Sequence, residues 1–207
     1  MCFSACGLFV FGGLSKVFSA GGYRLGFMRL PSAFEGYQDA YKALFSETFS
    51  CVSSPVQFAA LTAYEFEQDL QNQVRDSSFI LKYVSEYIYK EFSDISIECT
   101  KSQGAFYMVI GFNQFKSQIS KRGIYTSVDL ATFVLEKYKV AMLPGVDFGF
   151  EKEELFFRIA FVDFDGEKVM KMYQKSQEIT LDFLKQYTPN IIEGVEKIKK
   201  FIADLTD

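Results

Sequence analysis

Lys16 is the residue of this sequence whose surroundings best suit covalent chemistry. It lies in the stretch GGLSKVFSAGG, residues 12–22, and it is the only charged side chain between Met1 and Tyr23. A lysine that follows a buried strand among glycine, serine and apolar side chains loses hydration, which lowers the pKa of its amine and makes the amine usable as a nucleophile or base. The alternative interpretation is a loop lysine whose amine reaches water.

Two arginines could bind anionic groups. Arg24 follows Gly21 and Gly22. Paired glycines let backbone N–H groups converge on an anion, and a guanidinium beside them suits a phosphate in forked geometry. Arg158 lies in the apolar stretch LFFRIAFV, residues 155–162, so we expect it to be buried or at the edge of a cleft. A buried guanidinium needs an anionic partner, and the sequence leaves open whether that partner is an internal carboxylate or a ligand carboxylate.

Histidine is absent from the sequence, which excludes histidine-based triads, zinc sites with histidine ligands and a histidine general base. Chemistry near neutral pH would therefore use a lysine, a carboxylate, a tyrosine or a cysteine. The four cysteines, Cys2, Cys6, Cys51 and Cys99, form no CxxC pair. We interpret them as reduced, mostly buried thiols and expect no metal site.

The composition is that of an ordinary globular protein. The chain has 207 residues, of which 49% are hydrophobic and 23% charged, enough for one domain or two small ones. The net charge of −4 argues against a nucleic-acid-binding face. No run reaches the ~18 apolar residues of a membrane span, and the apolar start lacks the basic segment of a signal peptide. We therefore expect a cytoplasmic protein with no nucleic-acid or membrane partner.

The elements that must position these residues begin with a short strand. Residues 8–11 form an apolar run that Gly12 and Gly13 end. This pattern is typical of a strand buried on both faces in a parallel sheet covered by helices. Because such a strand is seldom the first of its fold, we expect further strands upstream of it.

One long helix or two collinear helices are predicted over residues 54–92. Ser54 can cap the helix, Pro55 suits its first position and Gln57 completes a capping box. Apolar residues then recur at helical spacing, with a polar interruption at residues 76–78. A helix of this length often links two domains, so we place the domain boundary along it.

Strands and helices are interleaved after residue 93, as in a small α+β domain. Strands are predicted at residues 95–99, 104–110, 140–143 and 155–164, and helices at 127–138, 167–187 and from 189 onward. We expect the helix 127–138 to place Val128, Ala131, Leu135 and Tyr138 on one apolar face. The apolar stripe of the last helix consists of Ile191, Ile192, Val195, Ile198, Ile202 and Leu205.

Lys16, Arg24 and Arg158 are more informative when the motifs that contain them are considered together. Residues 13–26 read G-L-S-K-x-x-S-A-x-G-x-R-L-G, followed by GAFY at 104–107, VAMLPG at 140–145 with FG at 148–149, and RIAF at 158–161. These stretches resemble, in order, the motifs of class I/II aminotransferases, over residues 8 to about 175. The resemblance implies the fold class α/β, as the C-terminal part of the pyridoxal-phosphate-dependent transferase fold type I, with a remnant of the large-domain parallel sheet. Residues 1–60 would be that remnant, 54–92 the interdomain helix and 93–207 the small C-terminal α+β domain.

The resemblance also implies roles. The cofactor would be pyridoxal 5'-phosphate, with Lys16 bonded to its aldehyde. Lys16 would be the catalytic residue, moving a proton between the substrate Cα and the cofactor C4′. Ser15 and Arg24 would bind the cofactor with Lys16, Arg24 holding the phosphate, and Arg158 would bind the α-carboxylate. The substrates would be an amino acid and a 2-oxo acid, and a homodimer is expected because family members are usually homodimers with sites near the interface.

Departures from the family pattern leave alternatives open. Gly13 stands where members often carry a phosphate-binding serine. Members are also considerably longer, and their additional part supplies an aromatic that stacks on the pyridine ring, an asparagine beside O3′ and an aspartate at the ring nitrogen. We therefore expect a truncated aminotransferase. The alternatives are an inactive fragment or pseudo-enzyme that acts through protein contacts, or another fold type I enzyme, such as a C–S lyase or a relative of aminocyclopropane-carboxylate synthase.

Overall fold

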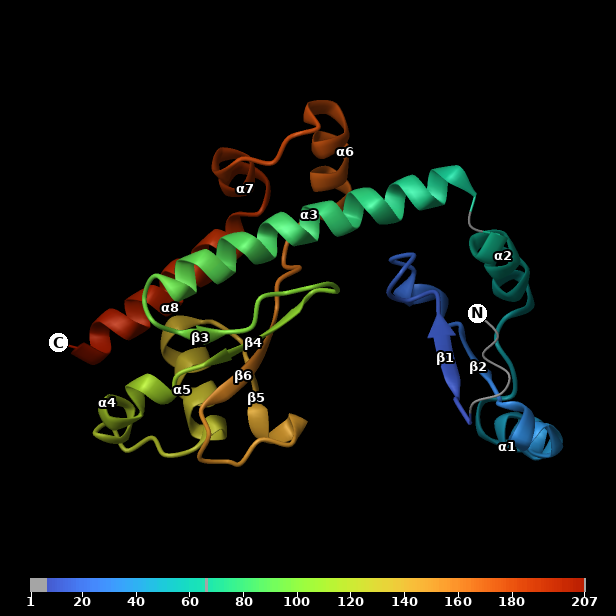
Figure 1. The fold of residues 1–207 in the computed structure, drawn as a ribbon, viewed down its shortest axis with the longest axis horizontal. Coiled ribbons are helices and arrows are strands. Elements are labelled where there is room, and N and C mark those ends of the chain that lie inside the picture. The colour runs from blue at the N-terminus through green and yellow to red at the C-terminus, as the bar shows by residue number, and fades with distance from the viewer. Residues whose placement is uncertain (1–6, 66, 207) are drawn as a thin grey trace. The chain divides into compact units, whose positions relative to one another are not determined.

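A computed structural model describes residues 7–65 and 67–206 (Figure 1). The chain forms two compact units, unit 1 with Met1–Arg75 and unit 2 with Asp76–Asp207. The boundary between the units falls inside helix α3, Gln68–Ser93. Each unit is described by itself below.

Unit 1 contains one small sheet. Strand β1, Val10–Gly13, pairs with β2, Gly26–Arg29, and the two are antiparallel, with Val10 opposite Arg29. The prediction of a strand buried on both faces in a parallel sheet is therefore wrong for the described residues, and Phe11 of β1 is 72% exposed. An apolar run shows only that a strand is suited to burial. Whether the strand is buried depends on the elements that cover it.

Besides the first turns of α3, the described residues of unit 1 contain four further helical segments. They are η2, Gly21–Tyr23, η3, Ser32–Tyr37, α1, Gln38–Phe49, and α2, Ser54–Glu65. Helix α2 begins at Ser54 as predicted, but the side-chain amide of Gln57 donates to the carbonyl of Val52 at 2.7 Å. The predicted span 54–92 consists of two helices, because α2 ends at Glu65 and α3 begins at Gln68.

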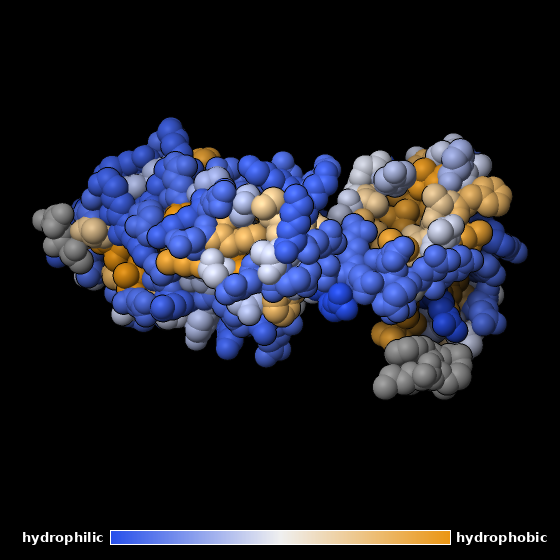
Figure 2. All heavy atoms as spheres, turned by 90° about the horizontal axis from the view of Figure 1, so that it is seen from above, coloured by the Kyte–Doolittle hydropathy of each residue, from blue (hydrophilic) through white to orange (hydrophobic). Residues whose placement is uncertain are grey.

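The core of unit 1 is very small. Among its described residues, only Leu14 and Ala60 are buried hydrophobic residues. Large apolar side chains are instead exposed, and such side chains are visible at the surface in Figure 2. They are Leu8, Phe11, Val17, Tyr23, Phe27, Phe34, Tyr37, Leu44, Phe45, Phe49, Phe58, Leu61 and Tyr64. An apolar surface of this extent is typical of a protein–protein or interdomain interface.

Unit 2 is built on a four-stranded antiparallel sheet with the order β3-β4-β6-β5. The strands are β3, Glu98–Cys99, β4, Tyr107–Gly111, β5, Leu143–Pro144, and β6, Phe156–Ala160. The strands predicted at 95–99, 104–110 and 155–164 each contain or overlap an observed strand, whereas the strand predicted at 140–143 is wrong except at Leu143, because β5 consists of Leu143 and Pro144. The other elements are η4, Asn113–Phe115, α4, Lys116–Ser120, α5, Ser127–Tyr138, η5, Gly145–Phe148, α6, Gly166–Ser176, α7, Leu181–Tyr187, and α8, Pro189–Thr206.

The core of unit 2 lies between one face of this sheet and helices that include α3 and α8 (Figure 1). Met108 and Ile110 of β4 and Phe157 of β6 supply the sheet side and are at most 1% exposed. The predicted stripe of α8 is confirmed, since Val195 and Ile198 are 3% and 2% exposed. Lys199 of α8 pairs with Glu91 of α3, which joins the two helices at their edge.

Two helix predictions in unit 2 need correction. Helix α5 has the predicted bounds, but Leu130 and Val134 are buried while Val128 and Leu135 are each 48% exposed. The helix carries apolar residues on more than one side, and its packing partners select which side is buried. The predicted helix 167–187 is two helices. Helix α6 ends at Ser176, with Gln177 in the left-handed conformation at φ 55°, and the Thr180 side chain caps α7.

Within residues 7–65 and 67–206, no helix is both long and apolar enough to cross a membrane. The same residues contain no group of three or more Cys, Asp or Glu side chains placed to hold a metal ion.

Candidate active site

Lys16 lies in the loop that joins β1 to β2. The ends of this loop are tied together, because the backbone N–H of Leu14 donates to the carbonyl of Leu25 at 3.1 Å. Inside it, the N–H of Ala20 donates to the carbonyl of Leu14 at 3.3 Å, and the N–H of Ser19 donates to the carbonyl of Lys16 at 3.2 Å. The Leu14 side chain is buried and anchors the loop. The backbone that carries Lys16 is therefore held in a defined turn.

The Lys16 side chain is exposed, so the prediction of a desolvated amine is wrong for the described chain. Desolvation of an amine requires apolar side chains around it. The neighbouring large side chains do not provide this cover, since Val17 is 54% and Tyr23 59% exposed. Any apolar surroundings for Lys16 would have to come from elements outside unit 1 as described.

Arg24 lies in the same loop as Lys16. Its backbone is in the left-handed conformation, with φ 53°, and its Nη1 donates to the carbonyl of Gly21 at 2.8 Å. The side chain is exposed. A side chain added at Gly22 would meet no atom within 4 Å, so the loop is open at that position. The loop thus carries a lysine, a serine and an arginine on one tethered segment, and these side-chain types suit an anionic ligand.

Gly13 has a structural reason to be glycine. A Cβ added there would lie 2.8 Å from the carbonyl oxygen of Leu25 and 3.2 Å from the Cα of Gly26. Both contacts are with backbone, which cannot move away without disturbing the pairing of β1 with β2. A serine at this position is therefore incompatible with the observed loop.

Arg158 lies on β6, opposite Val109 of β4 and Leu143 of β5. Its guanidinium is held between two aromatic rings, with Cζ 4.2 Å from the ring centroid of Tyr107 and 4.3 Å from that of Phe148. No acidic side chain of the described residues forms an ion pair with it. The internal carboxylate that the sequence left open is thus not found there. Arg158 is half-buried, so its charge keeps some contact with water.

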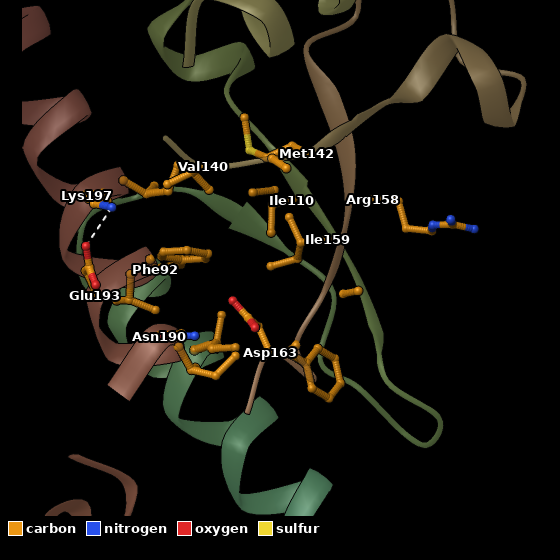
Figure 3. Close-up of a pocket in the computed structure, with 18 of the residues that line it drawn as sticks. Phe92, Ile110, Val140, Met142, Arg158, Ile159, Asp163, Asn190, Glu193 and Lys197 are labelled. Atoms are coloured by element: carbon orange, nitrogen blue, oxygen red, sulfur yellow. Dashed lines mark ion pairs between the residues drawn. The ribbon is translucent and has the colours of Figure 1, made fainter. Parts of the chain in front are cut away.

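A cavity of about 590 Å³ lies within unit 2, bordered by α3, α8 and the sheet. Figure 3 shows Phe92, Ile110 and Ile159 around this cavity, whereas the Arg158 side chain points away from it. Lys197 and Glu193, both on α8, form an ion pair of 2.6 Å at its edge. Arg158 and Tyr107 are among the residues that line the cavity, but side chains alternate along β6, so the Arg158 side chain lies on the sheet face opposite that of Phe157.

The cysteine prediction is partly wrong. Cys51 is exposed and Cys99 is half-buried, and both are free thiols. Burial raises the pKa of the Cys99 thiol, whose Sγ lies 3.7 Å from the carbonyl oxygen of Tyr89. Cys2 and Cys6 lie outside the described residues.

Lys16, Ser15 and Arg24 share the segment between β1 and β2 in unit 1, and Arg158 lies in unit 2. The sequence motifs did not indicate that two aromatic residues contact Arg158. Tyr107 was noted only as part of the stretch 104–107 and Phe148 only as part of 148–149. The signal that could have found Tyr107 is strand alternation, because Tyr107 shares a sheet face with Val109, the residue opposite Arg158.

Comparison with known proteins gives consistent matches. The family model described as aminotransferase class I and II matches residues 4–173. A probable aspartate/prephenate aminotransferase of Aquifex aeolicus is 28% identical over 200 residues, which are 95% of this chain and 41% of that protein. An aspartate aminotransferase of Geobacillus stearothermophilus is 31% identical over 144 residues, which are 68% of this chain and 34% of that protein.

Solved structures agree with the fold. An aromatic aminotransferase of Pyrococcus horikoshii superposes with a TM-score of 0.68 and 20% identity, over 95% of this chain and 43% of that one. The expected fold class, a part of fold type I, is thereby confirmed, although the two strands described in unit 1 are antiparallel. The chain spans about two fifths of the length of the relatives that it matches.

Proposed function

This chain belongs to the class I and II aminotransferases, and we propose that it carries the lysine and both anion-binding arginines of an enzyme that moves an amino group between an amino acid and a 2-oxo acid. The cofactor in this proposal is pyridoxal 5'-phosphate. The observation that carries the proposal is the single tethered loop that holds both Lys16 and Arg24. Arg158 lies in the same matched range, 4–173.

The residues of this loop fit two ends of the cofactor. An amine is the group that condenses with an aldehyde, and Lys16, an exposed residue, provides one. A guanidinium and a hydroxyl suit a phosphate, and Arg24 and Ser15 provide them. Arg24 uses one N–H on the carbonyl of Gly21, which fixes its position and leaves other N–H groups for an anion. When bound, the cofactor supplies an electron sink for the substrate Cα.

Four residues have tasks in this proposal. Lys16 Nζ binds the cofactor and later accepts the proton from the substrate Cα, as a general base. Arg24 and Ser15 hold the phosphate, so that the reacting atoms keep a fixed place. Arg158 binds the α-carboxylate through two parallel N–H···O bonds, which orients the Cα.

The relatives suggest a first substrate to test. The proteins of Aquifex aeolicus and Geobacillus stearothermophilus are named for aspartate. We propose aspartate as the amino donor on this basis. A homodimer and a cytoplasmic location are also proposed, the dimer from family membership and from the exposed apolar surface of unit 1, the location from the free thiols Cys51 and Cys99.

The test is selective labelling of Lys16. The chain is mixed with pyridoxal 5'-phosphate, reduced with borohydride and mapped by peptide mass spectrometry. Lys42 of α1 is the matched control, because it is an exposed lysine of the same unit. We expect the adduct at Lys16 to exceed that at Lys42 at least tenfold, and the excess to be lost in Arg24→Ala. Equal labelling of the two lysines in the folded chain would contradict cofactor binding at this loop.

A second candidate function has its own supporting observation. Unit 1 exposes many large apolar side chains and buries only Leu14 and Ala60 among its described hydrophobic residues. This favours a chain that acts through, or is stabilised by, contact with another polypeptide. Light scattering and a transaminase assay on the purified chain separate the two. Turnover of aspartate by the chain alone excludes the second function, whereas an inactive chain found only in complex with another polypeptide supports it.

A further inference from the structure

We infer that Tyr107 and Phe148 are positioning residues of the carboxylate site, because both rings lie against the Arg158 guanidinium. The inference rests on the proposed role of Arg158. It adds a prediction of its own, which is that the site binds a carboxylate in the chain as it is, without cofactor. The geometry that carries it is the pair of distances of 4.2 and 4.3 Å from Cζ to the two ring centroids.

Strand register explains why Tyr107 lies beside Arg158. Val109 is directly opposite Arg158, and Tyr107, two residues earlier on β4, is on the same face of the sheet. Diagonal neighbours of this kind are within reach of long and aromatic side chains. Tyr107 is 37% exposed, so its ring forms an outer wall of the site rather than part of the core.

A tight turn places Phe148 on the other side. Phe148 is the last residue of η5, which starts directly after β5. A Cβ added at Gly145, the first residue of η5, would lie 2.7 Å from the carbonyl oxygen of Phe156, so the turn packs closely against β6. Gly149 follows with φ +88°, a conformation that favours glycine. The turn therefore has little freedom, and the Phe148 ring is held over the guanidinium.

The two rings change how the guanidinium can bind. A cation over an aromatic face is attracted by the ring quadrupole. With both of its faces covered, the guanidinium can meet a ligand only through its edge, where two N–H groups match the two oxygens of a carboxylate. Ordering the side chain in advance also reduces the conformational entropy that is lost on binding. Lysine has neither the plane nor the forked donors, so it cannot replace arginine here.

The absence of an ion pair strengthens the argument. None of the ion pairs among the described residues uses Arg158, although the side chain is half-buried. A half-buried guanidinium with no acidic partner favours an anion from outside the chain. If the two rings only packed against the sheet, their removal would leave the anion affinity of Arg158 unchanged. The affinity of the ring variants therefore distinguishes packing from positioning.

The experiment uses the full chain, without cofactor, labelled with ¹⁵N for observation of the Nε–Hε signals of its five arginines. Arg158→Lys identifies the signal of Arg158. Pyruvate is the carboxylate probe, and its methyl ester, which has no carboxylate, is the matched neutral probe. We expect the Arg158 signal to lie upfield of the others because of ring currents, to shift with pyruvate and not to shift with the ester.

Ring variants then separate positioning from packing. Tyr107→Leu and Phe148→Leu are each expected to move the Arg158 signal downfield and to raise the Kd for pyruvate about two- to fivefold, the fold-change that corresponds to a partly exposed cation–π contact. Tyr107→Phe keeps the ring and should bind like the unchanged chain. Tyr125→Leu is the control, because Tyr125 is an exposed tyrosine of unit 2, 62% exposed, with no contact to Arg158 among the cation–π pairs described.

The outcomes distinguish this inference from the proposed function. An unchanged Kd in folded Tyr107→Leu and Phe148→Leu would overturn the positioning role and leave Arg158 as a carboxylate ligand. No response of the Arg158 signal to pyruvate would overturn both the inference and the role of Arg158. Labelling of Lys16 by the cofactor is measured separately and does not depend on either result.

Discussion

The hydroxyl of Tyr138 donates to Oδ2 of Asp204 at 2.8 Å, which joins the last residue of α5 to the end of α8. Lys200 of α8 pairs with the same carboxylate at 3.0 Å, and Arg122 donates to the backbone carbonyl of Asp204. The Tyr138 ring also packs against Phe201, with ring centroids 5.4 Å apart. The C-terminal turn of α8 is thus held against α5 by both polar and apolar contacts.

Tyr138→Phe tests the polar part of this connection. The variant keeps the ring and its packing and removes only the hydroxyl, so we expect the free energy of unfolding to fall by about 1 kcal/mol, the usual size of such a bond. Urea unfolding followed by circular dichroism measures the change. Tyr125→Phe removes a hydroxyl from an exposed ring and should have no effect. An equal loss in the two variants would show that the bond to Asp204 contributes nothing.

The same bond predicts a loss of stability at alkaline pH. Burial, and then the hydrogen bond to Asp204, raise the pKa of Tyr138 from 10.0 to about 12. Because the folded pKa lies above the unfolded one, the stabilisation is complete below pH 10 and is lost as the pH rises to 12. We expect the urea midpoint of the unchanged chain to fall more steeply over this window than that of Tyr138→Phe. Parallel pH profiles for the two chains would contradict the assignment.

Local chemistry made part of the fold predictable. The bounds of α5 and the buried stripe of α8 follow from the spacing of apolar residues, and the structure agrees with both. The buried face of α5 was not predictable, because Val128 and Leu130 are both apolar and only the packing partners distinguish them. Whether β1 pairs in a parallel or an antiparallel way was likewise not predictable, because an apolar run has the same pattern in both kinds of sheet.

The candidate site, like the fold, could be predicted from the sequence only in part. The tethered loop of Lys16 and Arg24 was indicated by residue types and spacing along one segment. The surroundings of Arg158 were not, because Tyr107 and Phe148 reach it from β4 and η5 and meet it only through strand register and the turn after β5. The exposure of Lys16 could not be predicted either, since burial of an amine depends on elements far from it in the sequence.

Gly13→Ser tests whether the loop excludes a side chain at this position. An added Cβ would lie 2.8 Å from the carbonyl oxygen of Leu25, so the loop must shift or β1 and β2 must separate. We expect the selective labelling of Lys16 by pyridoxal 5'-phosphate to fall severalfold. Gly22→Ala is the matched control, because no atom lies within 4 Å of the position of its Cβ. A Gly13→Ser chain that labels like the unchanged one would show that the loop adapts without cost.

Unit 2 should fold without unit 1. All the buried hydrophobic residues of the described chain except Leu14 and Ala60 belong to it, and they form one cluster around its sheet. Burial of apolar surface is the main stabilising contribution to folding, so this unit contains nearly all of that contribution. We expect a chain of residues 76–207 to give dispersed amide signals and a cooperative thermal transition, and a chain of residues 1–75 to give neither. A separate unit 2 without cooperative unfolding would mean that its core depends on contacts with unit 1, and the carboxylate site at Arg158 could then not be studied apart from the loop of Lys16.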